Sequence, residues 1–204
     1  MNALIRPYIW VKRFRHRCGY GVHSPFAFNL ITELFYEKTP FYDYQLLSAR
    51  ERTEGDADWR KAERTKVKRM LFRLVNHIQP RTVVAAGVPT AASIYLQAGC
   101  KRQQFCPLVT SGELKACCLP TVDFLYIGRS DEPDFRWKVF DSLADKVTPE
   151  TVFAVADINS SEAMKAMWKR MQQDERTGIT FDLYDVGIIF FDKSRFKQHY
   201  LVNF

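Results

Sequence analysis

The stretch that decides the fold is RTVVAAGVPTAASIYLQAG, Arg81 to Gly99. It predicts a buried strand over Thr82 to Ala86, a tight turn at Gly87, and a helix of small and apolar residues that ends at Gly99. A short apolar run that breaks at glycine and enters a helix is typical of the first strand and helix of an open parallel sheet. In such sheets a ligand meets the free N–H groups of the first helix, so we expect any site near Gly87 and Val88.

The same stretch lacks most of the residues that a nucleotide site uses. Such turns carry several glycines, which let the backbone approach the ligand, and an acid that accepts a hydroxyl. Here the turn has one glycine, a proline and alanines. The sequence therefore predicts the architecture of the site more firmly than its chemistry.

The length and composition fit one α/β domain with an added N-terminal segment. The chain has 204 residues, 47% of them hydrophobic, and we expect a helical extension and loop over 1–57 and an α/β domain over 58–204. The five cysteines lack the spacing of a zinc site or a disulfide framework, which favours free thiols in a reducing compartment. No segment has the length of a membrane span, and Arg6 and Pro7 interrupt the start of the chain, so we expect a cytoplasmic protein.

The net charge of +7 is concentrated at the N-terminus. No acid precedes Glu33, and residues 1–17 mix five basic side chains with Ile9, Trp10, Val11 and Phe14. Such a segment can bind nucleic acid phosphates or an anionic membrane. The favoured interpretation is a terminal helix that buries its aromatic side chains and leaves its charges in water.

The remaining chain alternates helices and strands. Ser24 and Pro25 begin a helix, 38–57 is a loop or a frayed helix, and Asp58 opens a long helix with a solvated basic face that ends at Pro80. Further strands are expected over 104–110, 122–127 and 151–156, and helices over 135–146 and after Ser160 or Ser161. The ranges 179–191 and 199–204 predict two antiparallel strands joined by the charged turn 192–197. Together these elements predict a mostly parallel sheet with an antiparallel edge.

Several stretches together carry a resemblance to a known family. They are Lys68 to Asn76 followed by Pro80 to Val84, the Gly-Tyr-Gly-Val-His-Ser-Pro-Phe segment of 19–26, and the C-terminal runs 157–164, 181–191 and 197–200. These stretches resemble the class I S-adenosylmethionine-dependent methyltransferases, and in particular a group common in Bacteroidetes-type bacteria. The resemblance covers most of the chain. It implies a Rossmann-like sheet with the cofactor across the carboxyl ends of its first, second and fourth parallel strands.

The chain departs from this family at the positions that hold the cofactor. Ala85 replaces the acid that ends the first strand, Ala91 replaces the second glycine of the loop, and Ser111 beside Gly112 replaces the ribose-binding acid. The third strand and its flanking helices are deleted, because only 113–120 separates two strands. Later in the chain Gly128-Arg129 replaces an Asp-Gly pair, and Ala156-Asp157 replaces an acidic pair.

These departures predict a methyltransferase-like protein with a degenerate cofactor site and weak or no activity. The expected S-adenosylmethionine-binding residues are Gly87, Val88, Ser111, Gly128 and Asp157, with Asp157 also the candidate catalytic residue. No catalytic metal is predicted, because Asp157 alone offers too few oxygen ligands. The alternative is a non-enzymatic binding or assembly protein on a methyltransferase scaffold. Its basic N-terminal helix is one candidate contact surface, and a homo-oligomer is one candidate assembly. The sequence names no methyl acceptor.

Overall fold

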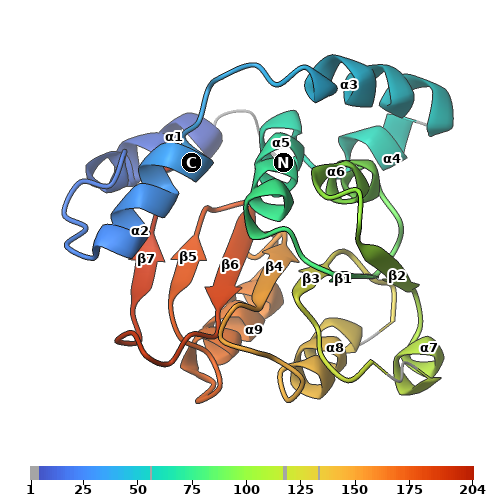
Figure 1. Ribbon diagram of the computed structural model, residues 1–204. Helices are drawn as coiled ribbons and strands as arrows, with labels where there is room; N and C mark the ends of the chain where they lie inside the picture. Colours follow the sequence, from blue (N-terminus) through green and yellow to red (C-terminus); the bar gives the residue numbers. More distant parts are fainter. Residues whose placement is uncertain (1–4, 56, 117–118, 133) are drawn as a thin grey trace.

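A seven-stranded sheet runs through the computed structural model, which describes residues 5–55, 57–116, 119–132 and 134–204 (Figure 1). The strand order is β2-β1-β3-β4-β6-β5-β7. The parallel part contains β1 (Thr82–Ala86), β2 (Gln104–Leu108), β3 (Phe124–Ile127) and β4 (Val152–Ala156). The C-terminal part contains β5 (Thr180–Asp182), β6 (Val186–Phe190) and β7 (His199–Leu201). The predicted α/β sheet is confirmed, and β1 has the predicted bounds.

Helices cover both faces of this sheet (Figure 1). One face packs against α2 (Pro25–Asn29), η2 (Leu30–Phe35, a π-helix), α5 (Thr65–Ile78) and α6 (Ala92–Gly99). The other packs against α7 (Ser111–Ala116), α8 (Phe135–Leu143) and α9 (Glu162–Gln173). Successive residues of a strand point to opposite faces of the sheet. In β1, Val83 belongs to the apolar core on one face and Val84 to the core on the other.

The predicted helix caps are present. The Ser24 hydroxyl accepts a hydrogen bond from the Ala27 N–H at 3.4 Å, and Pro25 occupies the first helical position of α2. Of the two serines considered for α9, Ser161 is the cap, and its hydroxyl accepts from the Met164 N–H at 3.1 Å.

The C-terminal strands pair differently from the prediction. The range 179–191 forms two strands, β5 and β6, which pair antiparallel, and β7 is parallel to β5. The chain reverses because the Asp182 carboxylate accepts the Tyr184 N–H at 2.8 Å and Tyr184 adopts a φ of 72°. The residues before Asp182 and after Asp185 are both apolar, so the hydrophobic pattern alone does not show that the strand is interrupted at 182–185.

Residues 38–57 contain a regular helix, α3 (Asp43–Glu54), where the sequence predicted a loop or a frayed helix. Its buried residues Tyr44, Leu47 and Glu51 recur at helical spacing. Tyr44 and Leu47 pack with residues of α5 and α6 in a separate apolar cluster. The prediction failed because a carboxylate occupies one of the three inward positions.

The long helix expected from Asp58 to Pro80 is two helices, α4 (Ala57–Lys61) and α5. Its basic face is only partly solvated, because Lys68 is 2% exposed and Arg73 is 7% exposed. Lys68 forms an ion pair with Glu51 of α3. Arg73 donates to the carbonyls of Leu34 and Phe35, at 2.9 and 3.2 Å, and so satisfies the end of η2.

The N-terminal segment differs from the favoured interpretation, because its aromatic side chains are exposed and two of its charges are paired. It forms α1 (Ile5–Lys12) and η1 (Phe14–His16), and residues 1–4 lie outside the described part. Trp10 is 47% exposed and Phe14 is 52% exposed. Two of its charges are instead paired, Arg6 with Asp185 at 2.9 Å and Arg13 with Asp182 at 2.8 Å. The acids of the β5–β6 turn therefore determine which side of α1 faces the domain.

Strand β2 is an edge of the sheet, because α7 is the one described element between β2 and β3 and no described strand pairs with the outer side of β2. This agrees with the prediction that 113–120 is too short for a further strand and two helices. Cys117 and Cys118 lie outside the described residues. Within the described ranges, no helix has both the length and the hydropathy needed to cross a membrane.

Candidate functional site

A cavity of about 430 Å³ lies at the carboxyl ends of β3 and β4, and Asp157 is the one predicted site residue that lines it. Glu63 and Arg64, from the connection between α4 and α5, line its wall. Arg129 follows β3 and Asp157 follows β4, and both also line it. In open α/β sheets this edge is where ligands bind. The cavity is therefore the candidate site.

Glu63 is a buried carboxyl group with one unpartnered oxygen. Its side chain is inward because the chain breaks between α4 and α5, and the residue is 8% exposed. Oε1 accepts from the Tyr126 hydroxyl at 2.7 Å and the Thr90 hydroxyl at 2.8 Å, while Oε2 is buried with no partner among the described residues. Burial raises the pKa of Glu63, and burial together with Glu63 raises the pKa of Tyr126.

Glu63→Gln is expected to stabilise the protein at neutral pH. The glutamine oxygen can accept both hydroxyls, and its NH2 group takes the unpartnered place of Oε2, so the variant gains only by removing a buried charge. Burial raises the pKa of Glu63 in the folded state above its usual value of 4.5. The unfolded chain therefore loses this proton more readily, and the free energy of unfolding falls as the pH rises from 4.5 through the folded-state pKa. The gain in Tm should thus be present at pH 7.5 and small at pH 4. Glu150→Gln, at an exposed position, is the control; equal changes for both variants would contradict this account.

Arg129 and Asp157 form an ion pair at the mouth of the cavity. Asp157 follows β4 with a φ of 57°, and its N–H donates to the Asp185 carbonyl at 2.7 Å. Hydrogen bonding to Asp157 raises the pKa of the Arg129 guanidinium, which also donates to the Ala62 carbonyl at 3.3 Å. The carboxylate predicted to be catalytic is therefore engaged by a cation of the same chain.

The turn after β1 is closed by main-chain hydrogen bonds. Gly87 N–H donates to the Leu108 carbonyl at 2.8 Å, and Val88 N–H donates to the Arg129 carbonyl at 2.7 Å. Gly87 has a φ of 109°, and a Cβ atom there would lie 2.2 Å from the Arg129 oxygen. The approach of Arg129 thus explains the glycine without any ligand, and the two N–H groups expected to meet one are already paired.

The polar groups of Ser111 are also hydrogen-bonded within the chain. Its N–H donates to the Glu132 carboxylate at 3.0 Å, and its hydroxyl donates to the same carboxylate. Ser111 lies at the start of α7, beyond the end of β2, where a ribose-binding acid was the expected residue. A carboxylate does lie here, but it comes from the loop after β3.

The predicted site residues lie along one edge of the sheet and are joined by one segment. Gly128 N–H extends the β1–β3 ladder by donating to the Ala86 carbonyl at 2.7 Å. From there residues 128–132, named here the plug segment, contact Val88 and Asp157 through Arg129 and Ser111 through Glu132.

The sequence predicted that these residues share one edge, but it did not predict Arg129 and Glu132 as their partners or Glu63 as a buried residue of the cavity wall. The one available indication was a cation directly after Gly128, opposite an acid that follows the neighbouring strand. Among the described residues, no group of three histidine, cysteine or acidic side chains could hold a metal ion.

Comparison of the fold with solved structures identifies its class. The structure of an O-methyltransferase from Bacillus cereus in complex with SAH superposes with a TM-score of 0.52 at 12% identity, covering 74% of this chain and 92% of that one. The fold is that of class I methyltransferases. SAH-bound PaMTH1 of Podospora anserina gives a TM-score of 0.57 at 9% identity, covering 83% and 96%. The O-methyltransferase TomG of Streptomyces achromogenes, in complex with SAM, gives 0.54 at 11%, covering 75% and 91%.

Sequence comparison adds no family to this methyltransferase fold. No family profile matches the chain, and no curated protein is significantly similar to it.

Proposed function

We propose that this chain is a methyltransferase-like protein with a degenerate cofactor site, which binds S-adenosylmethionine weakly or not at all and acts by binding another molecule. The observation that carries the proposal is the plug segment. Its groups pair with Val88, Ser111 and Asp157, three of the five positions through which a donor would be held.

The energetic argument combines missing and occupied groups. Each lost hydrogen bond to a charged group weakens binding by about 1.5–3 kcal/mol, and the acids expected at Ala85 and Ser111 are absent. A ligand must also displace Glu132 from Ser111 and the Arg129 carbonyl from Val88 before it gains any contact there. Two or three such losses reduce affinity by several powers of ten.

If methyl transfer occurs, Asp157 is the residue of this chain placed to orient or deprotonate an acceptor. It could do so only after Arg129 moves away, because the guanidinium hydrogen-bonds to its carboxylate. Methyl transfer depends mainly on how donor and acceptor are positioned, so a donor held at Gly87 and Gly128 would still be required. The proposed binding or assembly role without catalysis needs no such movement of Arg129.

Calorimetric titration with S-adenosylmethionine and S-adenosylhomocysteine tests the proposal. We expect no measurable heat and no rise in Tm at about 1 mM ligand, since a dissociation constant well above this value gives little stabilisation. The variant Glu132→Gln, with Asp131→Asn as its control, tests the plug separately. It should leave binding undetectable, because the Gly87 and Val88 N–H groups stay paired. Micromolar binding to the natural chain would overturn the proposal, and micromolar binding to Glu132→Gln alone would assign the closure to Glu132.

A further inference from the structure

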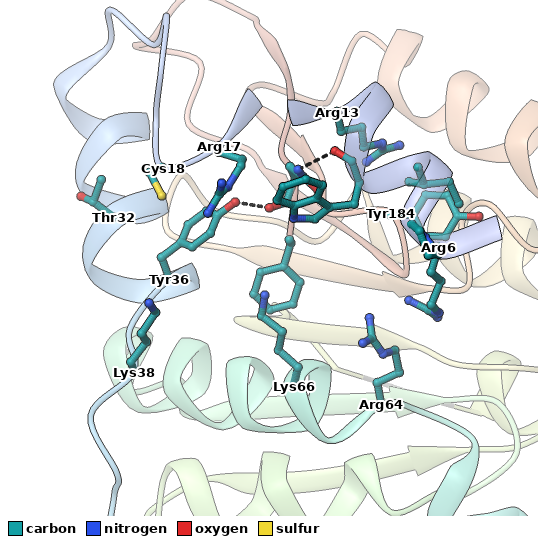
Figure 2. A pocket seen from close by; sticks show the side chains of 15 residues that line it. Arg6, Arg13, Arg17, Cys18, Thr32, Tyr36, Lys38, Arg64, Lys66 and Tyr184 are labelled. Atoms are coloured by element: carbon teal, nitrogen blue, oxygen red, sulfur yellow. Dashed lines mark hydrogen bonds between the residues drawn. The ribbon is translucent and has the colours of Figure 1, made fainter. Parts of the chain in front are cut away.

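A second cavity, of about 710 Å³, lies between α1, η2, the start of α5 and the C-terminal residues (Figure 2). It borders the candidate site, because Arg6, Arg64 and Tyr184 line both. Its volume is in the range of small-molecule binding sites. The plug segment supplies none of its lining residues.

The charged side chains that line this cavity are all cationic. They are Arg6, Arg13, Arg17, Lys38, Arg64 and Lys66. Three of these are neutralised by acids outside the cavity, Asp182 for Arg13 and Asp185 for Arg6 and Arg64. The other three have no carboxylate partner among the described residues. Such a concentration of one charge attracts anions.

The three cations without a carboxylate partner surround the same space. Figure 2 shows Lys38 and Lys66 on one side of the cavity and Arg17 on the other, beyond Tyr36. The Lys66 ammonium lies 4.0 Å from the ring centroid of Phe204. Burial lowers the pKa of Lys66, and Arg64, Arg73 and Lys38 lower it further. A bound anion would offset this repulsion.

The rest of the wall is apolar and largely aromatic. Trp10, Tyr36, Tyr184 and Phe204 line the cavity together with Ile9. Flat rings beside cations suit a molecule that joins a planar group to a phosphate, as bases stack on aromatic side chains while phosphates meet Lys and Arg. A concave wall of this kind fits a discrete ligand better than the flat surface of a membrane.

We propose that this cavity binds a nucleotide, with the phosphate between Arg17, Lys38 and Lys66 and the base against the aromatic wall. The nucleotide is either free or the phosphorylated end of a single strand. The inference deepens the binding role proposed above and rests on it, but it concerns different residues from the S-adenosylmethionine test.

Titration of the full chain with AMP at low salt tests this inference. We expect a dissociation constant of roughly 10–500 μM, with adenosine and inorganic phosphate each at least tenfold weaker. Lys66→Met should weaken AMP binding about tenfold or more, because it removes a charged partner of the phosphate. Lys101→Met is the matched control, as it removes one exposed positive charge outside the cavity. A 5′-phosphorylated DNA decamer that binds 100-fold tighter than AMP identifies a nucleic acid end as the source, and equal affinity identifies a free nucleotide.

Three results would overturn the inference: no AMP binding at 5 mM, equal weakening by Lys66→Met and Lys101→Met, or binding to anionic phosphatidylserine vesicles without binding to AMP. Unchanged far-ultraviolet circular dichroism of Lys66→Met shows that the variant is folded. AMP binding with no response to S-adenosylhomocysteine supports both proposals. Micromolar binding of S-adenosylhomocysteine removes the first proposal and leaves the nucleotide site to be judged by the Lys66 variant.

Discussion

Lys68→Met is expected to lower the free energy of unfolding by about 3–5 kcal/mol, the usual effect of removing one partner of a buried ion pair. Lys68 is 2% exposed and joins α5 to α3 through Glu51, which is 8% exposed. Its ammonium also donates to the Arg60 carbonyl at 2.9 Å. Without it, the Glu51 carboxylate would stay buried beside the Tyr95 hydroxyl, which donates to it at 3.2 Å.

Urea unfolding at pH 7 measures this loss. Lys66→Met, two residues earlier on the same helix, removes an ammonium that has no carboxylate partner among the described residues and should change stability by less than about 0.5 kcal/mol. The double variant Lys68→Met with Glu51→Met should be more stable than Lys68→Met alone, because no uncompensated charge remains. A single-variant loss below about 1 kcal/mol, or a double variant that is less stable still, would show that the pair is not buried as described.

Gly87→Ala is expected to destabilise the protein by about 2–4 kcal/mol, from the combined effects of backbone strain and overpacking. The added Cβ would lie 2.2 Å from the Arg129 carbonyl oxygen, at a φ of 109° that side chains rarely adopt. The plug segment would have to move, and the hydrogen bond from Val88 N–H would be lost.

Thermal and urea unfolding of Gly112→Ala provides the comparison. Gly112 lies in α7, and a Cβ atom there would meet nothing closer than the Thr110 hydroxyl at 3.7 Å. Alanine should be neutral or stabilising at this position by up to about 1 kcal/mol. If both alanine variants behaved alike, close packing of Arg129 on Gly87 would not be the reason for the glycine.

Local sequence patterns predicted the sheet well because each strand is short, apolar and bounded by a turn residue. β1 and the caps at Ser24 and Ser161 depend on neighbours within a few positions, and these agree with the structure. The burial of Lys68 could not be found in this way. Its partner Glu51 is 17 residues away on a helix whose inward face holds few apolar residues.

The candidate site shows the same division. Residues that follow parallel strands must meet at one edge, so Gly87, Ser111, Gly128 and Asp157 could be grouped from their positions alone. Which groups pair there depends on the path of the plug segment after Gly128, and no periodic pattern specifies that path. The exposed rings of Trp10 and Phe14 were missed for a related reason, since the acids that orient α1 lie more than 160 residues away in the chain.

The position of β2 at the rim of the sheet affects association between molecules. The N–H of Gln104 and the carbonyl of Leu108 face β1. Because backbone groups alternate in direction along a strand, the backbone groups of Phe105 and Pro107 point away from β1. Proline has no N–H, which leaves Phe105 as the one outward amide donor within this strand. A strand of another molecule that aligned with β2 could accept only the Phe105 N–H as a hydrogen bond. Pro107 therefore disfavours the addition of further strands at this edge, and with it the growth of fibrils.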